Sequence, residues 1–149
     1  MSKSTKFLSR LYAFHFLYKS SNLSNIDAEN LSEQIMDFEL TLHSILEEDP
    51  NTKNLNVDSK EFGKVIIDQF ISHLEEINIE IHKFIHRNNF ENLTATEKTI
   101  LKLGYYELKF TRNAYNEIIN DYVELAKSYG TKDSYSMING VLDSVRKSI

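Results

Sequence analysis

Apolar residues return every three or four positions along most of this chain, the spacing at which side chains share one face of an α-helix. The pattern is clearest in the last third, where it divides into segments around 94–108, 118–130 and 133–145. The apolar faces predicted for these helices are Ile100, Leu101, Gly104 and Leu108; Ile118, Ile119, Tyr122, Leu125, Ala126 and Tyr129; and Ile138, Val141, Leu142 and Val145.

The first of these helices carries its own start signal. Thr94 or Thr96 can act as the N-cap, and Glu97 follows Thr94 at the three-residue spacing of a capping box. In such a box the side chain of each residue accepts a hydrogen bond from the backbone of the other. We therefore expect a helix to begin close to residue 94.

The other two helices are bounded by glycine and by small polar residues. Gly130 ends the second at the position where a left-handed residue commonly closes a helix, and Asp133 or Ser134 can cap the third. Asn139-Gly140 would ordinarily mark a turn, but it falls inside a strong apolar pattern. We therefore predict that a neighbouring helix packs closely against Gly140.

The first two thirds of the chain show the same periodicity, interrupted by polar loops near residues 20–26, 51–57 and 87–92. Pro50 closes the second helix, because proline disfavours helix at the residue before it. The helices expected here are 5–20, about 27–48, and one from a cap at Asp58 or Ser59 through Phe62, Ile66, Phe70 and Leu74, which continues to Ile85 after a break near Asn78.

These segments predict an all-α protein of six or seven helices in two small packed bundles. No segment shows the two-residue alternation of a strand, and one Pro and four Gly leave little material for a turn-rich β fold. At 149 residues, we expect a single domain, 1–149. Its helical subdomains would span about 1–87 and 92–149.

The composition limits the cellular location of the protein and the kinds of site that it can form. The chain has no Cys, which excludes disulfides, thiolate metal sites and thiol catalysis. No run reaches the roughly 18 apolar residues of a membrane span, and the N-terminus shows no signal peptide. We therefore expect a cytoplasmic protein with no membrane association.

The net charge of −5 argues against general coating of nucleic acid, but the charge is unevenly distributed. Residues 1–26 hold four cations and no acid, whereas residues 27–61 hold ten acids. Lys3, Lys6 and Arg10 share one helix face if the first helix extends that far. This face could hold phosphates beside nearby tyrosines, or it could be an ordinary exposed helix terminus.

His82 and His86 suggest metal chemistry, because they lie four residues apart on an expected helix. However, no glutamate completes a zinc-protease motif and no third ligand is placed by the sequence. The acids of residues 27–61 resemble a solvated helix face rather than an acid–base pair. We therefore predict no metal, no cofactor and no enzymatic activity, and a helical enzyme using these histidines is the least favoured alternative.

Three blocks of the last third resemble, in order and spacing, the C-terminal half of the NusB family of transcription antitermination factors. They are EKTILKLGYYEL from Glu97, INDYVELAKSYG ending at Gly130, and DSYSMINGVLD from Asp133. Phe16-Leu-Tyr18 also matches the end of the family's first helix. Because the chain ends at Ile149, we do not expect the related domain that is fused to an RNA methyltransferase.

The resemblance implies roles for particular residues. Tyr18 aligns with a family tyrosine at the RNA-contacting surface, and Asp133 and Met137 fall in a motif that contributes to that surface. Met137 stands where the family has phenylalanine, so it keeps an apolar contact but loses a flat ring. Glu97 lies on the helix face that docks the ribosomal protein NusE.

The resemblance also groups four cations with the RNA-binding residues. Lys102 stands where the family usually has arginine. Lys3, Lys6 and Arg10 occupy the N-terminal arm, where the family carries several consecutive arginines. The arm of this chain is therefore poorer in arginine than the family pattern.

By resemblance, the chain is expected to be a bacterial antitermination factor, not an enzyme. Such proteins pair with NusE, bind boxA-type single-stranded RNA and work with other Nus factors on elongating RNA polymerase, notably during ribosomal RNA synthesis. The arginine-poor arm leaves open the alternative of a protein–protein adaptor with weak or no RNA binding. A homodimer is also left open.

Overall fold

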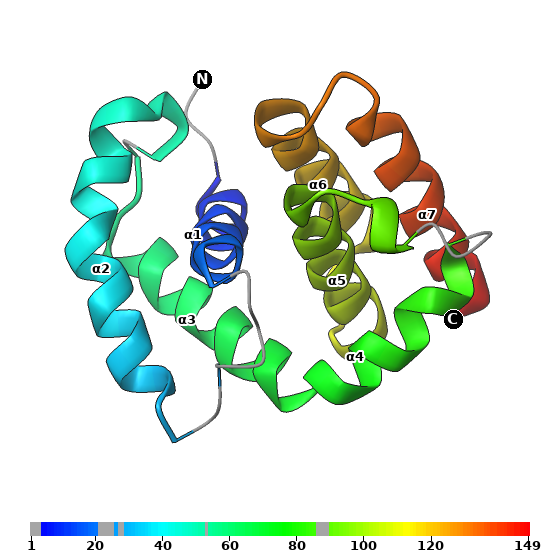
Figure 1. Cartoon of the computed structure of the whole chain (residues 1–149), viewed down its shortest axis with the longest axis horizontal. Coiled ribbons are helices and arrows are strands. Elements are labelled where there is room, and N and C mark those ends of the chain that lie inside the picture. The colour runs from blue at the N-terminus through cyan, green and yellow to red at the C-terminus, as the bar shows by residue number, and fades with distance from the viewer. Residues whose placement is uncertain (1–3, 21–25, 27–28, 53, 86–89) are drawn as a thin grey trace. The chain divides into compact units, whose positions relative to one another are not determined.

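The computed structural model describes residues 4–20, 26, 29–52, 54–85 and 90–149. Within them the chain forms seven α-helices and no strand, which confirms the all-α prediction (Figure 1). The helices are α1 Thr5–Lys19, α2 Leu31–Glu48, α3 Val57–Ser72, α4 Leu74–Glu80, α5 Ala95–Phe110, α6 Tyr115–Tyr129 and α7 Ser134–Ser148, with 3-10 turns η2 Pro50–Thr52 and η3 Ile81–Phe84. None of the described helices is long and apolar enough to cross a bilayer.

The chain divides into two compact units, Met1–Ser72 and His73–Ile149. The boundary therefore falls between α3 and α4, earlier than the loop near residues 87–92 where two subdomains were expected to meet. The reason is packing, because α4 and η3 lie against α5 and so belong with the C-terminal helices. Residues 87–89 of that expected loop lie outside the described part of the chain.

In the first unit, α1 packs along α3 (Figure 1). Ser4 caps α1 by accepting a hydrogen bond from the Phe7 N–H at 3.0 Å. Every residue from Phe7 to Leu17 is buried, as expected of a helix that is enclosed rather than half-exposed. The two helices approach closely at Gly63, where a Cβ would lie 2.5 Å from Cδ1 of Tyr12.

One carboxylate joins the three helices of this unit. Glu39 on α2 accepts a hydrogen bond from the Tyr12 hydroxyl at 2.7 Å, and its Oε1 lies 3.3 Å from Nζ of Lys64 on α3. Burial, reinforced by this carboxylate, raises the pKa of Tyr12. The ring of Tyr12 also meets Phe38 edge-on at 5.3 Å between centroids. Glu39 thus fixes α2 against the α1–α3 pair.

The third helix differs from its prediction at both ends. It begins at Val57 rather than after Asp58, because Asn56 and Ser59 form a reciprocal cap. The Asn56 side chain accepts from the Ser59 N–H, and the Ser59 hydroxyl accepts from the Asn56 N–H, each at 2.8 Å. The helix ends at Ser72, so the break precedes the expected one near Asn78.

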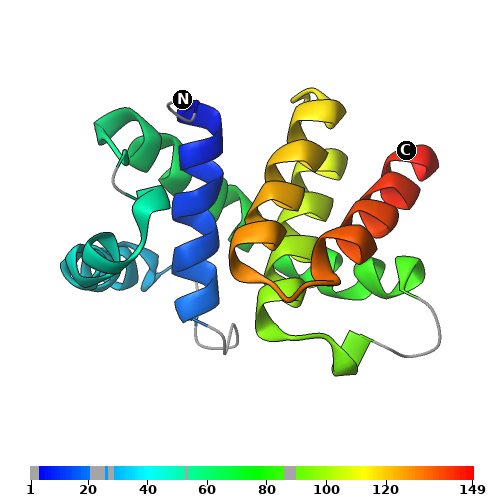
Figure 2. The ribbon, with the colours of Figure 1, turned by 90° about the horizontal axis from the view of Figure 1, so that it is seen from above.

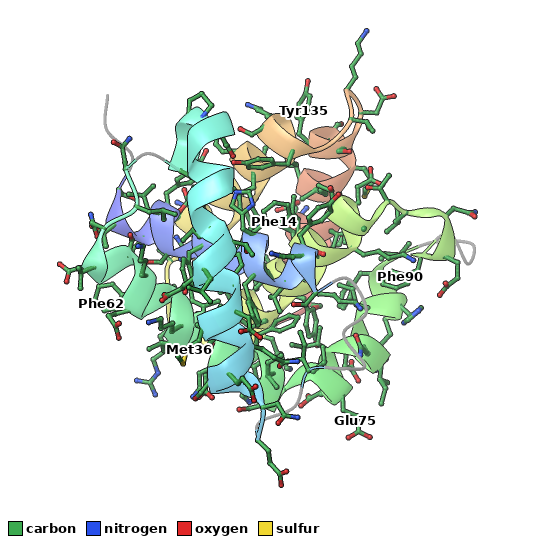
Figure 3. The ribbon with its side chains drawn as sticks, turned by 60° about the vertical axis from the view of Figure 1, so that its left-hand side comes forward. Phe14, Met36, Phe62, Glu75, Phe90 and Tyr135 are labelled. Atoms are coloured by element: carbon green, nitrogen blue, oxygen red, sulfur yellow. The ribbon has the colours of Figure 1, made fainter. Side chains whose placement is uncertain are left out.

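The face of the third helix also differs. Phe62 was expected in the apolar face, but it is 56% exposed at the outside of the first unit (Figure 3). The buried residues of α3 are instead Ser59, Gly63, Ile67 and Phe70. These four are spaced by three and four residues, so they form the helix face that packs inward.

In the second unit, α5, α6 and α7 lie side by side (Figure 2). The predicted apolar faces of these helices are buried, except that Ile119, Tyr129 and Val141 are only partly covered. Gly104 allows α7 to approach α5, because a Cβ there would lie 2.7 Å from a methyl carbon of Leu142.

Two glycine predictions were wrong. Gly140 is exposed, and a Cβ added to it would meet nothing within 4 Å, so no helix packs against it. Gly130 has φ −94° and ψ −171°, which is extended rather than left-handed. Its glycine is required by packing, since a Cβ would lie 2.7 Å from both the Ala126 carbonyl oxygen and Cβ of Ser134.

Candidate functional site

The basic face predicted on the first helix is only partly present. Lys3 lies outside the described residues, and Lys6 is exposed. Arg10 is 2% exposed, so the prediction of a shared exposed face is wrong for Arg10. Its guanidinium lies in the interior, where a phosphate of the RNA backbone cannot reach it without movement of the helix. An RNA-binding role for Arg10 stays a prediction.

Tyr18 lies at the end of α1, where the sequence placed it. The ring is 44% exposed and stacks on Phe14, with 5.7 Å between centroids and 26° between planes. One face of the ring is therefore supported by the interior. A supported, partly exposed aromatic ring is suited to stacking with an unpaired base.

The start of α7 carries the other predicted RNA contacts. Asp133 is exposed, and although it occupies the N-cap position its side chain makes no capping hydrogen bond. Its carboxylate is therefore not committed to holding the helix. Met137 follows one turn later and is partly covered.

Tyr135 is a further candidate for a base contact that the predicted RNA-binding residues do not include. Its ring is 43% exposed, near the start of α7 (Figure 3). The Lys127 ammonium lies 5.4 Å from the ring centroid, a cation–π distance. Tyr135 lies two residues after Asp133 and two before Met137, so this ring and the cation over it are close to the predicted RNA contacts of α7. No periodic signal marks an exposed tyrosine, so the sequence did not reveal it.

The capping box predicted at the start of α5 is confirmed. The Thr94 hydroxyl accepts from the Glu97 N–H at 3.1 Å, and Oε1 of Glu97 accepts from the Thr94 N–H at 2.9 Å. Oε2 of the same carboxylate accepts from the Ser134 hydroxyl at 2.7 Å. Glu97 therefore caps one helix and also holds the first residue of another.

Ser134 continues this chain of hydrogen bonds into the turn before α7. It is fully buried, and its hydroxyl oxygen accepts from the Thr131 N–H at 2.9 Å. Gly130 packs directly against it. The turn that carries Asp133 is thus anchored through Ser134 to the start of α5.

Lys102 has a different setting from the other predicted contacts. It follows Glu97 by five residues and so points from a different face of α5. Its ammonium lies 5.4 Å from the centroid of Phe90, with Lys98 at 5.2 Å from the same ring. Burial, and then the neighbouring Lys98, lower the pKa of Lys102.

The candidate residues are distributed over both units. Lys6 and Tyr18 lie on α1 of the first unit, whereas Glu97, Asp133 and Met137 lie in the second. In the second unit, the hydrogen bond from Ser134 to Glu97 connects the residue that is predicted to bind NusE with the start of α7, where the RNA contacts are predicted.

The histidine pair gains no support as a metal site. Nδ1 of His82 lies 2.8 Å from the Asn78 carbonyl oxygen, and the His82 ring packs 4.6 Å from Phe90. His86 lies outside the described residues. Among the residues that are described, no three His, Cys, Asp or Glu side chains converge as metal ligands would.

A groove of about 520 Å³ runs between α6 and α7. Its walls hold asparagines and apolar residues together with Tyr115, Asp143 and Arg146. Hydrogen bonds from Lys147 and Arg146 lower the pKa of Asp143, which favours its charged form. The lining contains no histidine, serine or lysine that could form a nucleophile–base pair.

Comparison with known proteins agrees with the fold and the motifs. The NusB family model matches residues 8–147. The transcription antitermination protein NusB of Thermodesulfovibrio yellowstonii is 36% identical over 98 residues, which is 65% of each chain. That of Actinobacillus succinogenes is 38% identical over 108 residues, 72% of each chain.

Solved structures of the same fold are similar over nearly the whole chain. A crystal structure of antitermination factors NusB and NusE in complex with dsRNA matches with a TM-score of 0.72 and 26% identity, covering 97% of this chain and 98% of that one. The solution structure of NusB from Aquifex aeolicus matches with a TM-score of 0.70 and 27% identity, covering 98% and 90%. The chain therefore belongs to the NusB family of transcription antitermination proteins, which are not enzymes.

Proposed function

We propose that this protein is a transcription antitermination factor that binds boxA-type RNA together with the ribosomal protein NusE. The observation that supports this most strongly is the likeness, over 97% of the chain, to a NusB that was solved with NusE and dsRNA. In this role the protein acts in the cytoplasm, on elongating RNA polymerase with other Nus factors, during ribosomal RNA synthesis.

The mechanism is recognition rather than catalysis. Lys6 holds backbone phosphate by charge, while the partly exposed rings of Tyr18 and Tyr135 offer surfaces on which unpaired bases stack. The Asp133 carboxylate repels phosphate, so it accepts hydrogen bonds from base or ribose donors. Lys127 lies beside Tyr135 and supplies a second cation near the start of α7. Phosphate contacts thus position the RNA, and Asp133 and Tyr135 at the start of α7 contact its bases or riboses.

The test is a titration of labelled boxA RNA with the purified protein, alone and with purified NusE. A scrambled single strand and a double-stranded RNA of equal length serve as controls, because the related complex contains double-stranded RNA. We expect boxA to bind more tightly than the scrambled strand, and NusE to increase its affinity. Equal binding of boxA and scrambled RNA, with and without NusE, would contradict the proposal.

The adaptor alternative rests on a specific observation. Because Arg10 is 2% exposed, the N-terminal arm offers fewer accessible cations than its sequence suggests, and phosphate contacts supply much of RNA affinity. An adaptor would bind NusE but not boxA RNA in the same titration. That result would replace the RNA-binding role while leaving the partner role in place.

A further inference from the structure

Glu97 occupies a central place in the second unit. Its two carboxylate oxygens have separate donors, the Thr94 N–H on one and the Ser134 hydroxyl on the other. Thr94 and Glu97 belong to the start of α5, whereas Ser134 is the first residue of α7. A single side chain therefore connects the starts of two helices, through residues that are 37 positions apart in the chain.

The turn before α7 has little freedom to move independently of this bond. Ser134 is fully buried, and its hydroxyl O–H donates to Glu97 while the hydroxyl oxygen accepts from the Thr131 N–H. Gly130 packs so tightly against Ser134 that a Cβ would overlap it. Asp133 and Tyr135 are the covalent neighbours of Ser134. The position of both depends on where Ser134 is held.

We propose that Glu97 is a positioning residue for RNA binding, which acts through Ser134 to hold Asp133 and Tyr135 in place. A cationic side chain of the protein partner that docks on Glu97 then acts on the RNA contacts through the same carboxylate. This inference rests on the proposed function, because it assumes that Asp133 and Tyr135 bind RNA.

The chemistry of a carboxylate allows both contacts at once. Two carboxylate oxygens offer about four acceptor positions, and intramolecular donors use two of them. A partner cation can therefore join the carboxylate without displacing Ser134. It then restrains the Glu97 side chain in the rotamer that holds Ser134. RNA binding afterwards loses less conformational entropy, which couples the two ligands positively.

The decisive variant is Ser134→Ala, which removes the bond to Glu97 and the one from the Thr131 N–H but keeps the carboxylate and the α5 capping box. Ser144→Ala is the matched control, because Ser144 lies on the same helix and its exposed hydroxyl bonds only to the Gly140 carbonyl. The dissociation constant of boxA RNA is measured for each protein with and without saturating NusE. The ratio of the two constants is the coupling factor.

We expect the wild type and Ser144→Ala to show the same coupling factor, within the range of about 5- to 150-fold that is common for coupled sites. In Ser134→Ala the factor should fall towards one, with weaker RNA binding and unchanged affinity for NusE alone. A general loss of stability would not remove the coupling factor, provided that circular dichroism shows the variant folded at the assay temperature. An unchanged coupling factor in Ser134→Ala overturns the inference.

Glu97→Gln provides a second route, and it decides the question if Ser134→Ala does not fold. Glutamine keeps the capping box but removes the charged acceptor for Ser134 and for the partner cation. We expect the coupling factor to be lost here also, and wild-type coupling in Glu97→Gln would contradict the inference. If the wild type itself binds no boxA RNA, the proposed function fails instead, so the two failures can be told apart.

Discussion

At the scale of single residues, the absence of a side chain allows close helix packing at Gly104 but not at Gly140. Both glycines lie inside helices. At Gly104 a Cβ would be 2.7 Å from a Leu142 methyl carbon, whereas at Gly140 it would meet nothing. Glycine is costly in a helix interior because of its backbone freedom. That cost is offset by close packing at Gly104 only.

Alanine substitutions should therefore change stability in opposite directions. Gly140→Ala should raise the free energy of unfolding by roughly 0.5–1 kcal/mol, because helix propensity improves without any contact. Gly104→Ala should lower it by about 1–3 kcal/mol, since the added methyl overpacks the α5–α7 contact. Urea denaturation of both variants measures the two values. A loss of stability in Gly140→Ala would mean that the glycine has a role that the packing does not show.

A second residue-scale contrast concerns Lys6 and Arg10. Because Lys6 is exposed, its replacement by glutamine should flatten the dependence of log RNA affinity on log salt by about 0.7, the value for one phosphate contact on a single strand. Arg10→Gln should leave this slope unchanged, since its guanidinium is buried. Titrations at four salt concentrations measure both slopes, with Lys109→Gln as an exposed control on α5. A flatter slope for Arg10→Gln would show that α1 moves on binding RNA.

Tyr18 should contribute through its ring rather than through charge. Tyr18→Ala should weaken RNA binding by about 1–3 kcal/mol at every salt concentration if a base stacks there. Tyr18→Phe keeps the ring and should bind nearly as well as the wild type. If both variants weaken binding equally, the hydroxyl rather than the ring makes the contact.

At the scale of helices, the ends are set by local hydrogen bonds with recognisable spacing. The box formed by Thr94 and Glu97 was visible in the sequence and is present in the structure. Asn56 and Ser59 make an equivalent reciprocal cap at the start of α3. The sequence favoured Asp58 or Ser59 at that point, because neighbouring cap formers competed for the assignment. Only the backbone path decided that Asn56 lies outside the helix.

The α5 cap should have a measurable effect on stability. Thr94→Ala should lower the free energy of unfolding by about 0.5–2 kcal/mol, because the Glu97 N–H loses its acceptor. Thr99→Ala is the control, since the Thr99 hydroxyl only donates to the Ala95 carbonyl within the same helix. Thermal unfolding of the two variants makes the comparison. An equal loss of stability in the two variants would mean that the capping box contributes no more than an ordinary threonine hydroxyl on this helix.

At the scale of the whole molecule, a buried histidine links folding to pH. Burial lowers the pKa of His15 below its usual value of 6.5, although the Asp49 carboxylate, 3.6 Å away, acts in the opposite direction. The folded protein therefore binds fewer protons at this residue than the unfolded chain does. Stability from neutral His15 is fully present above the unfolded pKa and is lost as pH falls through the folded pKa.

We expect the free energy of unfolding to fall as the pH is lowered from about 7 to about 5, and His15→Gln to reduce that fall. Denaturant unfolding at several pH values gives the slope for each protein. His82→Gln is the matched control, because it removes a histidine that is exposed. The same slope in all three proteins would place the responsible groups elsewhere.

The sequence by itself determined the helical class, most helix positions, the α5 cap and the family. These properties depend on residues within about one helical turn of each other, or on motifs of contiguous residues, so periodicity and spacing are enough to reveal them. The NusB-like blocks from Glu97 to Asp143 belong to this kind of evidence. They also point to Asp133 and Met137 as RNA contacts, which stays a prediction.

Only the tertiary structure decided which of these residues are accessible and which act together. Helical periodicity placed Lys6 and Arg10 on one face, but the packing of α1 exposes the first and buries the second. The apolar pattern also predicted close packing at Gly140, whereas the structure shows close packing at Gly104 and none at Gly140. The bond from Ser134 to Glu97 joins residues 37 positions apart. Distances of that kind depend on how helices pack against one another, and periodicity along one helix carries no information about the position of the next.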